Sequence, residues 1–410
     1  MLVTFLVFAF LALLILVILL WQLWPSSRIS TSVPGITPSV ETLGNVPDIR
    51  DAGGIAKFLK KLHGDHGLIA SFWINDFLAI SLSSASLFKL VNAGNSERPY
   101  QSIVPITSDQ DVLESVTKAD GILNNLLSTF APFSSPPPRD LENSVQKLVD
   151  ELIVALTQLR DDDQIPIEDY MTALSVKIVS ETSPSVVRKN LDSNKLRSLF
   201  AQISAELDLF LDFGAPDFDA EQKNSLSKNI IEFCQMVEGA DGRSLVFSQI
   251  LVISSLATWA LYYLAKLETL QTKLWRGTDV ELEMFLTEVV RVTSLVPLRS
   301  AVLGQSLTLL GHTVAEGTLV ISSLGSHYGA DKTFPSPADI DISRQNCADV
   351  LSLIHSEAAN SYSFQVVLLI VRQFLKTFYI SPAYSEMNVD QKFRLVTKPD
   401  CDIWLKLKRK

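Results

Sequence analysis

Two oppositely charged residues at helical spacing are the clearest signal of a buried polar site. Glu288 and Arg291 are three residues apart, so on a helix they face the same side. Surface pairs with this spacing are common. Here, however, Phe285-Leu286 precede the pair and Val289-Val290 lie inside it, which indicates a largely buried helix. Because a buried arginine needs a partner, the pattern predicts a buried Glu288–Arg291 ion pair.

Histidine and cysteine spacings give no support to several common catalytic classes. The five histidines include no HExxH motif, which a zinc hydrolase would carry. The three cysteines, Cys234, Cys347 and Cys401, are far apart, so neither a metal cluster nor a redox dithiol is indicated. The sequence also has no GxSxG elbow, P-loop or dinucleotide-binding glycine motif. Such isolated thiols fit a reducing compartment, for example the cytosolic side of a membrane.

Charge and composition narrow the possible partners. The chain has 410 residues, 47% hydrophobic and 20% charged, which is a globular composition able to bury a large core. Its net charge of −10 argues against nucleic-acid binding, because an acidic chain repels phosphate backbones. One basic run, Lys406 to Lys410, is interpreted as a solvated tail in preference to a contact with anionic lipid.

The N-terminus has the length and composition of a membrane anchor. Leu2 to Leu20 are apolar apart from Thr4, and Trp21 and Trp24 close the run as an interfacial belt would. A cleaved signal peptide is the alternative, but no basic residue precedes the run and the run is long for such a peptide. Basic residues follow the span, so the positive-inside rule predicts a cytosolic body. We divide the chain into an anchor (1–24), a proline-rich hinge (25–50) and a folded domain (51–410).

Hydrophobic periodicity in the body predicts many helices and few strands. A helix is expected from Ile55 to a stop at Gly64, followed by a hairpin of Leu68–Ile74 and Phe77–Leu82 around Asn75-Asp76. Further helices are expected at 141–160, 168–181, 190–212, 225–237, 281–294 and 364–378, with strands at 306–310 and 318–322. The pattern predicts a mainly α protein with a small β-sheet region.

Residues 245–265 are almost uniformly apolar and need separate treatment. A second membrane span is possible by length, but Ser248, Gln249, Ser254, Ser255 and Thr258 interrupt the run. We therefore interpret it as a long helix through the middle of a soluble core.

Read in order, these segments resemble the microsomal cytochrome P450 architecture, and most of all the orphan cytochrome P450 family 20. Four features carry the resemblance: the hinge Pro34–Pro38 with Gly44–Ile49, the segments Phe58–His63 and Ser71–Trp73, Thr258–Ala260 at the end of a central helix, and Leu286–Arg291 as an ExxR helix. Phe334–Pro337 and Arg344 then resemble the family's WPSP…R segment. The resemblance implies a P450-like fold in which Glu288, Arg291 and Arg344 form a structural triad, with two guanidiniums on one carboxylate.

The same resemblance exposes departures where the family holds its heme. A P450 places a thiolate ligand just before its last long helix. Counting back from Phe364 puts Ala359 near that position, and alanine cannot ligate iron. Cys347 lies too early and Cys401 too late, which leaves His355 as a weak candidate for a substitute ligand. The acid–alcohol pair expected near Ser254 and Ser255, and the basic residues expected within 121–126, are also missing.

By resemblance, the expected function is a heme-dependent monooxygenase of the endoplasmic reticulum. It would act on a lipophilic substrate with molecular oxygen and an NADPH–P450 reductase partner. The alternative is a non-catalytic, P450-shaped binding or interaction protein, or a transcript that skips the exon carrying the ligand. A heme protein with His355 as ligand is the third hypothesis. Catalytic residues are not assigned.

Overall fold

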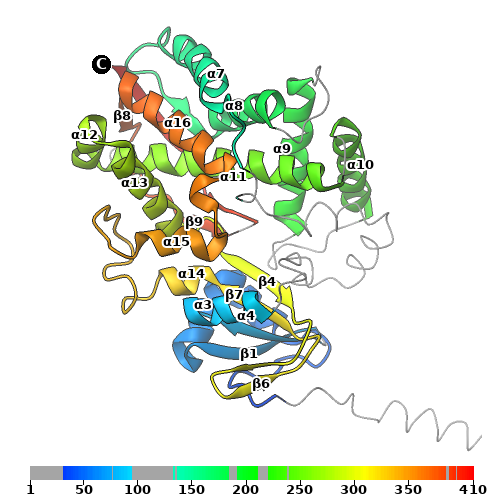
Figure 1. The fold of residues 1–410 in the computed structure, drawn as a ribbon. Coiled ribbons are helices and arrows are strands. Elements are labelled where there is room, and N and C mark those ends of the chain that lie inside the picture. Colours follow the sequence, from blue (N-terminus) through cyan, green and yellow to red (C-terminus); the bar gives the residue numbers. More distant parts are fainter. Residues whose placement is uncertain are drawn as a thin grey trace, which may run out of the picture. The chain divides into compact units, whose positions relative to one another are not determined.

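Helices dominate the computed structural model, and the strands form four small sheets in the described residues (Figure 1). This confirms the predicted class, mainly α with a small β-sheet region. The structure describes residues 31–75, 77–94, 133, 136–183, 192–210, 220–237, 240–384, 387–393 and 395–410. The predicted anchor (1–24) and the stretch 121–126 lie outside the described residues. Val33–Lys410 forms one compact unit, to which everything below refers.

The N-terminal hairpin forms where the sequence predicts it. Strands β1 (Ile69–Ile74) and β2 (Phe77–Leu82) pair antiparallel with Ile74 opposite Phe77. Asn75 at the turn has φ 52°, a left-handed conformation that asparagine tolerates better than most residues. β2 also pairs in parallel with β7 (Leu319–Ser323), and β7 pairs antiparallel with β4 (Leu298–Val302). The sequence analysis does not predict β4.

Two short helices cover one face of this four-stranded sheet. They are α2 (Val46–Asp51) and α3 (Ile55–His66), which share a small core with the sheet through the contact of Phe58 with Phe72. The prediction that α3 stops at Gly64 is wrong. The helix continues to Gly67, whose φ of 88° suits glycine at a helix end.

Residues 33–50, most of the predicted hinge, are hydrogen-bonded to β1. Gly35 lies so close to this strand that an added Cβ would stand 2.0 Å from the Ser71 carbonyl oxygen. Asn45 accepts a hydrogen bond from the Trp73 backbone N–H through Oδ1 (2.9 Å) and donates to the Thr37 carbonyl (2.8 Å). This segment is therefore fixed to the sheet.

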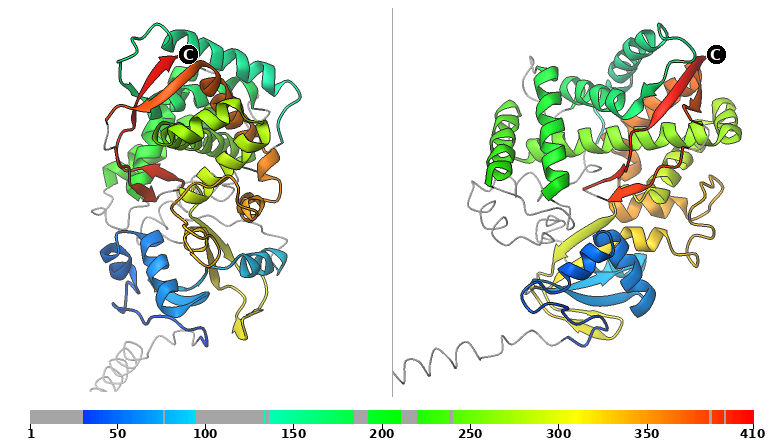
Figure 2. Two further views of the ribbon diagram at one scale, coloured as in Figure 1. Left: turned by 90° about the vertical axis from the view of Figure 1, so that its left-hand side faces the viewer. Right: turned by 180° about the vertical axis from the view of Figure 1, so that it is seen from behind.

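The larger core lies among long helices that surround α11 (Ala240–Lys266). Those packed against α11 or close to it are α7 (Leu141–Leu156), α8 (Ile167–Thr182), α9 (Ser193–Phe210), α10 (Ala220–Met236) and α16 (Tyr362–Thr377). Among the described residues, one helical stretch, Leu245–Lys266, is long and apolar enough to cross a membrane, and 94% of its apolar window is buried in the protein. Its burial among the other helices confirms the interpretation of a core helix (Figure 2).

The C-terminal segment completes two small sheets. β11 (Trp404–Arg409) lies between β3 (Ile165–Pro166) and β8 (Phe378–Pro382), and β9 (Gln391–Phe393) pairs with β10 (Thr397–Pro399). The predicted basic tail is a paired strand, in which Lys408 and Arg409 are exposed as predicted and Lys406 and Lys410 are half-buried. Leu405 and Leu407 point into the core, which leaves Lys406 and Lys408 on the other side of a paired strand.

Four helices and a hairpin precede α16 in the chain. They are α12 (Glu268–Arg276), α13 (Asp279–Val292), α14 (Leu324–Tyr328), α15 (Cys347–Ile354) and the hairpin β5 (Leu307–Leu309) with β6 (His312–Val314). A further helix, α4 (Ala85–Gly94), follows β2.

Candidate functional site

Helix α13 presents the predicted buried ion pair. Thr278 caps its start: Thr278 Oγ1 accepts from the Glu281 N–H, and the Glu281 carboxylate accepts from the Thr278 N–H. Near the other end of the helix, Arg291 donates to both oxygens of Glu288, Nε to Oε1 at 2.7 Å and Nη2 to Oε2 at 2.8 Å. Both side chains are fully buried, so this is a bidentate ion pair with almost no water to screen it.

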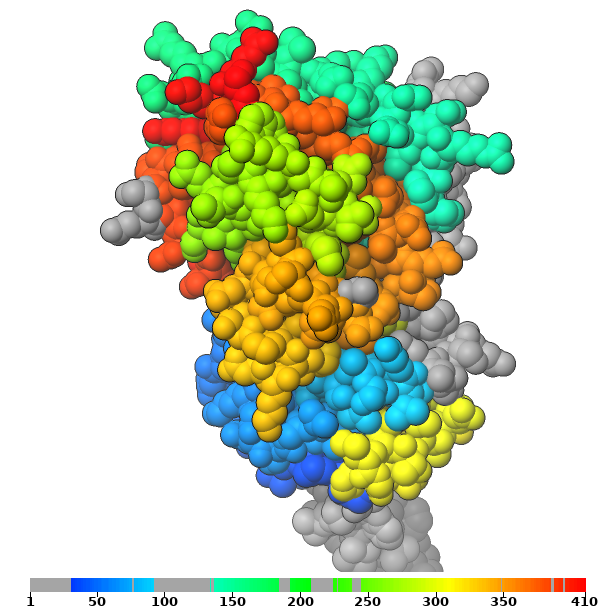
Figure 3. Space-filling view, turned by 60° about the vertical axis from the view of Figure 1, so that its left-hand side comes forward, coloured from blue at the N-terminus to red at the C-terminus, as the bar shows by residue number. Residues whose placement is uncertain are grey.

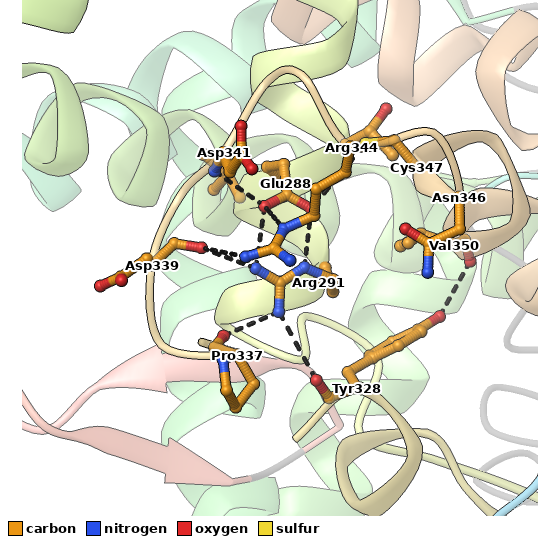
Figure 4. Close-up of polar contacts among 12 residues, drawn as sticks. Glu288, Arg291, Tyr328, Pro337, Asp339, Asp341, Arg344, Asn346, Cys347 and Val350 are labelled. Carbon is orange, nitrogen blue, oxygen red and sulfur yellow. Dashed lines mark hydrogen bonds and ion pairs between the residues drawn. The ribbon is translucent and has the colours of Figure 1, made fainter. Parts of the chain in front are cut away.

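The structure brings Arg344 to the same carboxylate. Arg344 Nε donates to Glu288 Oε2 at 3.0 Å, and the Asp341 backbone N–H donates to that oxygen at the same distance (Figure 4). Glu288 thus accepts bonds from two guanidiniums and one amide. Hydrogen bonds from this many donors to one carboxylate offset much of the free-energy cost of burying three charged groups.

Both arginines also tie down the loop that follows α14. Arg291 donates to the Pro337 carbonyl at 2.7 Å and to the Asp339 carbonyl at 2.8 Å, while Arg344 donates to the Pro335 carbonyl at 2.7 Å. The Arg291 guanidinium also lies over the Phe334 ring, 5.1 Å from its centroid. On the surface, this orange segment lies between yellow-green α12–α13 and the blue residues of the sheet (Figure 3). The triad is therefore a brace between a buried helix and a surface loop.

Cys347 belongs to this cluster. Its Sγ lies 3.7 Å from the Met284 carbonyl and 3.9 Å from Glu288 Oε1. Burial, with the nearby Glu288 carboxylate, raises the pKa of the Cys347 thiol to about 12. The thiol therefore stays protonated at neutral pH and is held against the triad.

The loop before α16 contains no thiol. α15 ends at Ile354, a short 3-10 turn covers Ala358–Asn360, and Ser361 caps α16 by accepting from the Phe364 N–H. Ala358 is buried, whereas Ala359 is exposed and its carbonyl accepts from the Gln365 side chain at 2.8 Å. The other two cysteines are elsewhere, Cys234 buried in α10 and Cys401 exposed after β10.

His355 lies in the same loop, half-buried at the end of α15. Its Nδ1 lies 3.2 Å from the Glu357 backbone N–H and accepts from it. Burial, with the positive charge of Arg299, lowers the pKa of His355, so the ring is neutral at pH 7. A neutral ring whose Nδ1 accepts a hydrogen bond carries its proton on Nε2. In an imidazole that ligates a metal, one nitrogen binds the metal and the other usually donates a hydrogen bond. This arrangement does not suit a metal ligand.

Arg299 is a half-buried charged residue that the sequence analysis does not identify. It lies in β4, and its Nη1 donates to the Leu353 carbonyl at the end of α15. Burial lowers the pKa of Arg299 to about 9. An arginine directly after the apolar Val296-Pro297-Leu298 was the available signal, but the sequence does not predict the strand β4 itself.

Several known proteins are similar to this chain along almost its whole length. The chain is 23% identical to cytochrome P450 20A1 of Rattus norvegicus over 449 residues, which cover 93% of this chain and 94% of the relative. The Homo sapiens protein of the same name is 22% identical over 454 residues, covering 95% of each chain. The chain resembles cytochrome P450 20A1. No family model matches it.

Resemblance to a cytochrome P450 implies heme, and the residues in the described chain do not fit a thiolate-bound heme. All three cysteines of the sequence are described, and none lies in the loop before α16. Within the described ranges, no group of three His, Cys, Asp or Glu side chains is arranged to hold a metal ion. Ser254 Oγ, in the helix that a P450 uses for oxygen protonation, is bonded to the Leu251 carbonyl at 3.1 Å. The chain therefore has the P450-like triad, whereas its loop before α16 lacks the cysteine that ligates heme in a P450.

Proposed function

We propose that this chain is a membrane-anchored, P450-like protein that binds a lipophilic small molecule and does not carry out thiolate-dependent oxygenation. What supports the proposal is one contrast: the Glu288–Arg291–Arg344 brace is complete, while the loop before α16 presents an exposed Ala359. Thiolate donation is what drives O–O cleavage in a P450, and no other side chain in that loop can replace it. The brace needs no cofactor, because its contacts hold backbone and side chains together.

A heme-dependent monooxygenase is the second candidate. Its support is the similarity to cytochrome P450 20A1, which runs along more than nine-tenths of the chain. This candidate would use heme, molecular oxygen and an NADPH–P450 reductase, and would require a ligand other than residue 359. The ligand class expected for both candidates is lipophilic, by analogy with the fold.

A reduced carbon monoxide spectrum of the purified full-length protein separates these candidates. The proposal predicts that no heme band appears in protein expressed with a heme precursor. A thiolate-type shift would establish the monooxygenase candidate and overturn the proposal. A histidine-type band that disappears in a His355→Ala variant would instead establish the third hypothesis, a histidine-ligated heme protein.

The membrane anchor and the endoplasmic reticulum location rest on the sequence alone. Residues 2–20 have the length of a bilayer core, and the basic residues that follow predict a cytosolic body. In microsomes, the full chain should resist alkaline extraction, and its C-terminal body should be degraded by external protease. A chain released by alkali, or a protected body, would contradict the anchor or its orientation.

A further inference from the structure

A cavity of about 480 Å³ lies beside the triad, and Arg291 is one of its lining residues. Its volume falls within the range of small-molecule sites in proteins. Its walls come from α3, the end of α11, α14, the loop at Pro337-Ala338 and the segment at β9. In the view from behind, the red C-terminal strands lie beside the blue helices that supply the opposite wall (Figure 2, right). None of the sequence motifs discussed above accounts for this space.

Two lysines at the cavity have no ion-pair partner in the described chain. Lys57 and Lys60 lie three residues apart on α3, so their side chains share a face. Both are exposed, and no ion pair connects either of them to a described carboxylate. Asp390 is the one carboxylate among the lining residues, and the Arg291 guanidinium is neutralised by Glu288. The lining therefore has an excess of positive charge.

A phenol from the core helix adds a neutral donor. The half-buried Tyr263 lines the cavity, and its hydroxyl makes no hydrogen bond to any described residue. Its ring is fixed by stacking on Trp259, with centroids 6.1 Å apart. Burial raises the pKa of Tyr263 to about 12, so the hydroxyl is a donor at neutral pH. A fixed donor without an acceptor suits a ligand with acceptor oxygens.

The remaining wall is partly apolar. Ala56 on α3, Val292 at the end of α13, and Val389 and Phe393 beside β9 supply hydrocarbon surface. A ligand that fits both the positively charged and the apolar parts of the lining needs an anionic head for the lysine ammonium groups and an apolar body for the hydrocarbon wall.

We propose that this cavity binds a small amphipathic anion, with its oxygens at Lys57, Lys60 and the Tyr263 hydroxyl and its chain against Val292, Val389 and Phe393. A carboxylate and a phosphate ester share this chemistry. Binding here needs neither heme nor the loop before α16, so the inference stands or falls separately from the proposed function.

Titration calorimetry with octanoate and octyl phosphate tests the site on the full chain in nanodiscs, with empty nanodiscs as the blank. Both probes are compared with octylammonium, which has a similar chain and the opposite charge. We expect saturable binding of one or both anions, and none of the cation. The preferred anion identifies the head group. Equal binding of octylammonium, or no binding of either anion, would overturn the proposal.

Three variants and one control locate the binding. Lys57→Gln with Lys60→Gln should weaken anion binding at least tenfold, whereas Lys61→Gln with Lys89→Gln, which removes the same charge from exposed positions outside the lining, should leave it within twofold. Ala338→Trp should block the cavity from its surface loop, and Tyr263→Phe should weaken binding several-fold while keeping the ring contacts. If both lysine pairs weaken binding equally, or if Ala338→Trp binds as the unchanged chain does, the anion binds elsewhere and the proposal fails.

Discussion

The triad and the loop before α16 differ although both belong to the segment between α13 and α16. At the triad, Glu288 accepts from two guanidiniums and the Asp341 N–H, and each arginine fixes backbone carbonyls of the surface loop. Before α16, Ala359 has a methyl group in solvent, and His355 is turned to a local backbone N–H. Many contacts fix the first region, whereas the second contains no thiol that could serve as the thiolate ligand of a heme.

The difference follows from what each region contributes to stability. Removing one member of a buried ion network leaves an uncompensated charge in the core, so a chain that keeps Arg291 and Arg344 also needs Glu288 for stability. A metal ligand contributes to stability only through the metal it binds. A chain can therefore lose a ligand loop without unfolding, and the triad is poor evidence for catalysis.

The largest expected effect comes from the carboxylate of the triad. Glu288→Gln keeps the shape but leaves Arg291 and Arg344 without their negative charge, so the free energy of unfolding should fall by about 3–5 kcal/mol. Urea unfolding followed by circular dichroism measures this loss. Glu283→Gln on the same helix, outside the network, is the matched control and should change stability by less than about 0.5 kcal/mol. A loss below about 1 kcal/mol at Glu288 would mean that the brace is not a stabilising element.

A smaller loss is expected when the second arginine is replaced by another cation. Arg344→Lys keeps the charge near Glu288 but cannot span the Glu288 carboxylate and the Pro335 and Ser336 carbonyls together. The free energy of unfolding should fall by about 1–3 kcal/mol. Proteolysis within 335–344 should also become faster, because the loop loses its tether. An unchanged cleavage rate would show that other contacts hold this loop.

The cap of α13 should matter less again. Thr278→Ala removes the oxygen that accepts from the Glu281 N–H, and about 1 kcal/mol of stability should be lost. Thr269→Ala, at an exposed position near the start of α12, serves as the control because that side chain makes no capping bond in the described chain. Equal thermal shifts for both variants would argue that the capping box does not set the start of the helix.

The smallest effect is expected in the ligand loop. Ala359 is exposed, so Ala359→Ser should change the free energy of unfolding by less than about 0.5 kcal/mol. Its neighbour Ala358 is buried, and Ala358→Ser should cost more than about 1 kcal/mol by burying a hydroxyl. If Ala359→Ser proves the costlier change, residue 359 faces an interior site and the contrast between the two regions disappears.

Local patterns explain which parts of the fold the sequence predicts. The β1–β2 hairpin follows from six strand residues on each side of the Asn75-Asp76 turn, and α13 follows from its helical period, so both signals lie within a few residues. β4 was missed because its partner β7 lies well beyond it in the sequence, and β6 was missed because it is only three residues long. β11 was misread because Lys406, Lys408 and Arg409 suggest solvent, although alternate residues of the same strand are buried.

The site shows the same division. The spacing of Glu288 and Arg291 indicates their contact directly, because both lie on one helical face. Arg344 is bonded to Glu288 across 56 positions of sequence, so only the resemblance connected them beforehand. The contacts of Cys347 with Glu288 and of Arg299 with the Leu353 carbonyl depend on how α15 is placed, which no local pattern encodes.

The central claim is that the triad is intact although the chain has no thiolate ligand for heme. The iron and heme content per chain tests this claim most directly. The full-length protein and its Cys347→Ala variant are purified after expression with a heme precursor, and both are assayed for bound iron. We predict that both contain far less than one heme per chain and that the variant matches the unchanged protein. One heme per chain, with a thiolate-type carbon monoxide band that Cys347→Ala abolishes, would contradict this account.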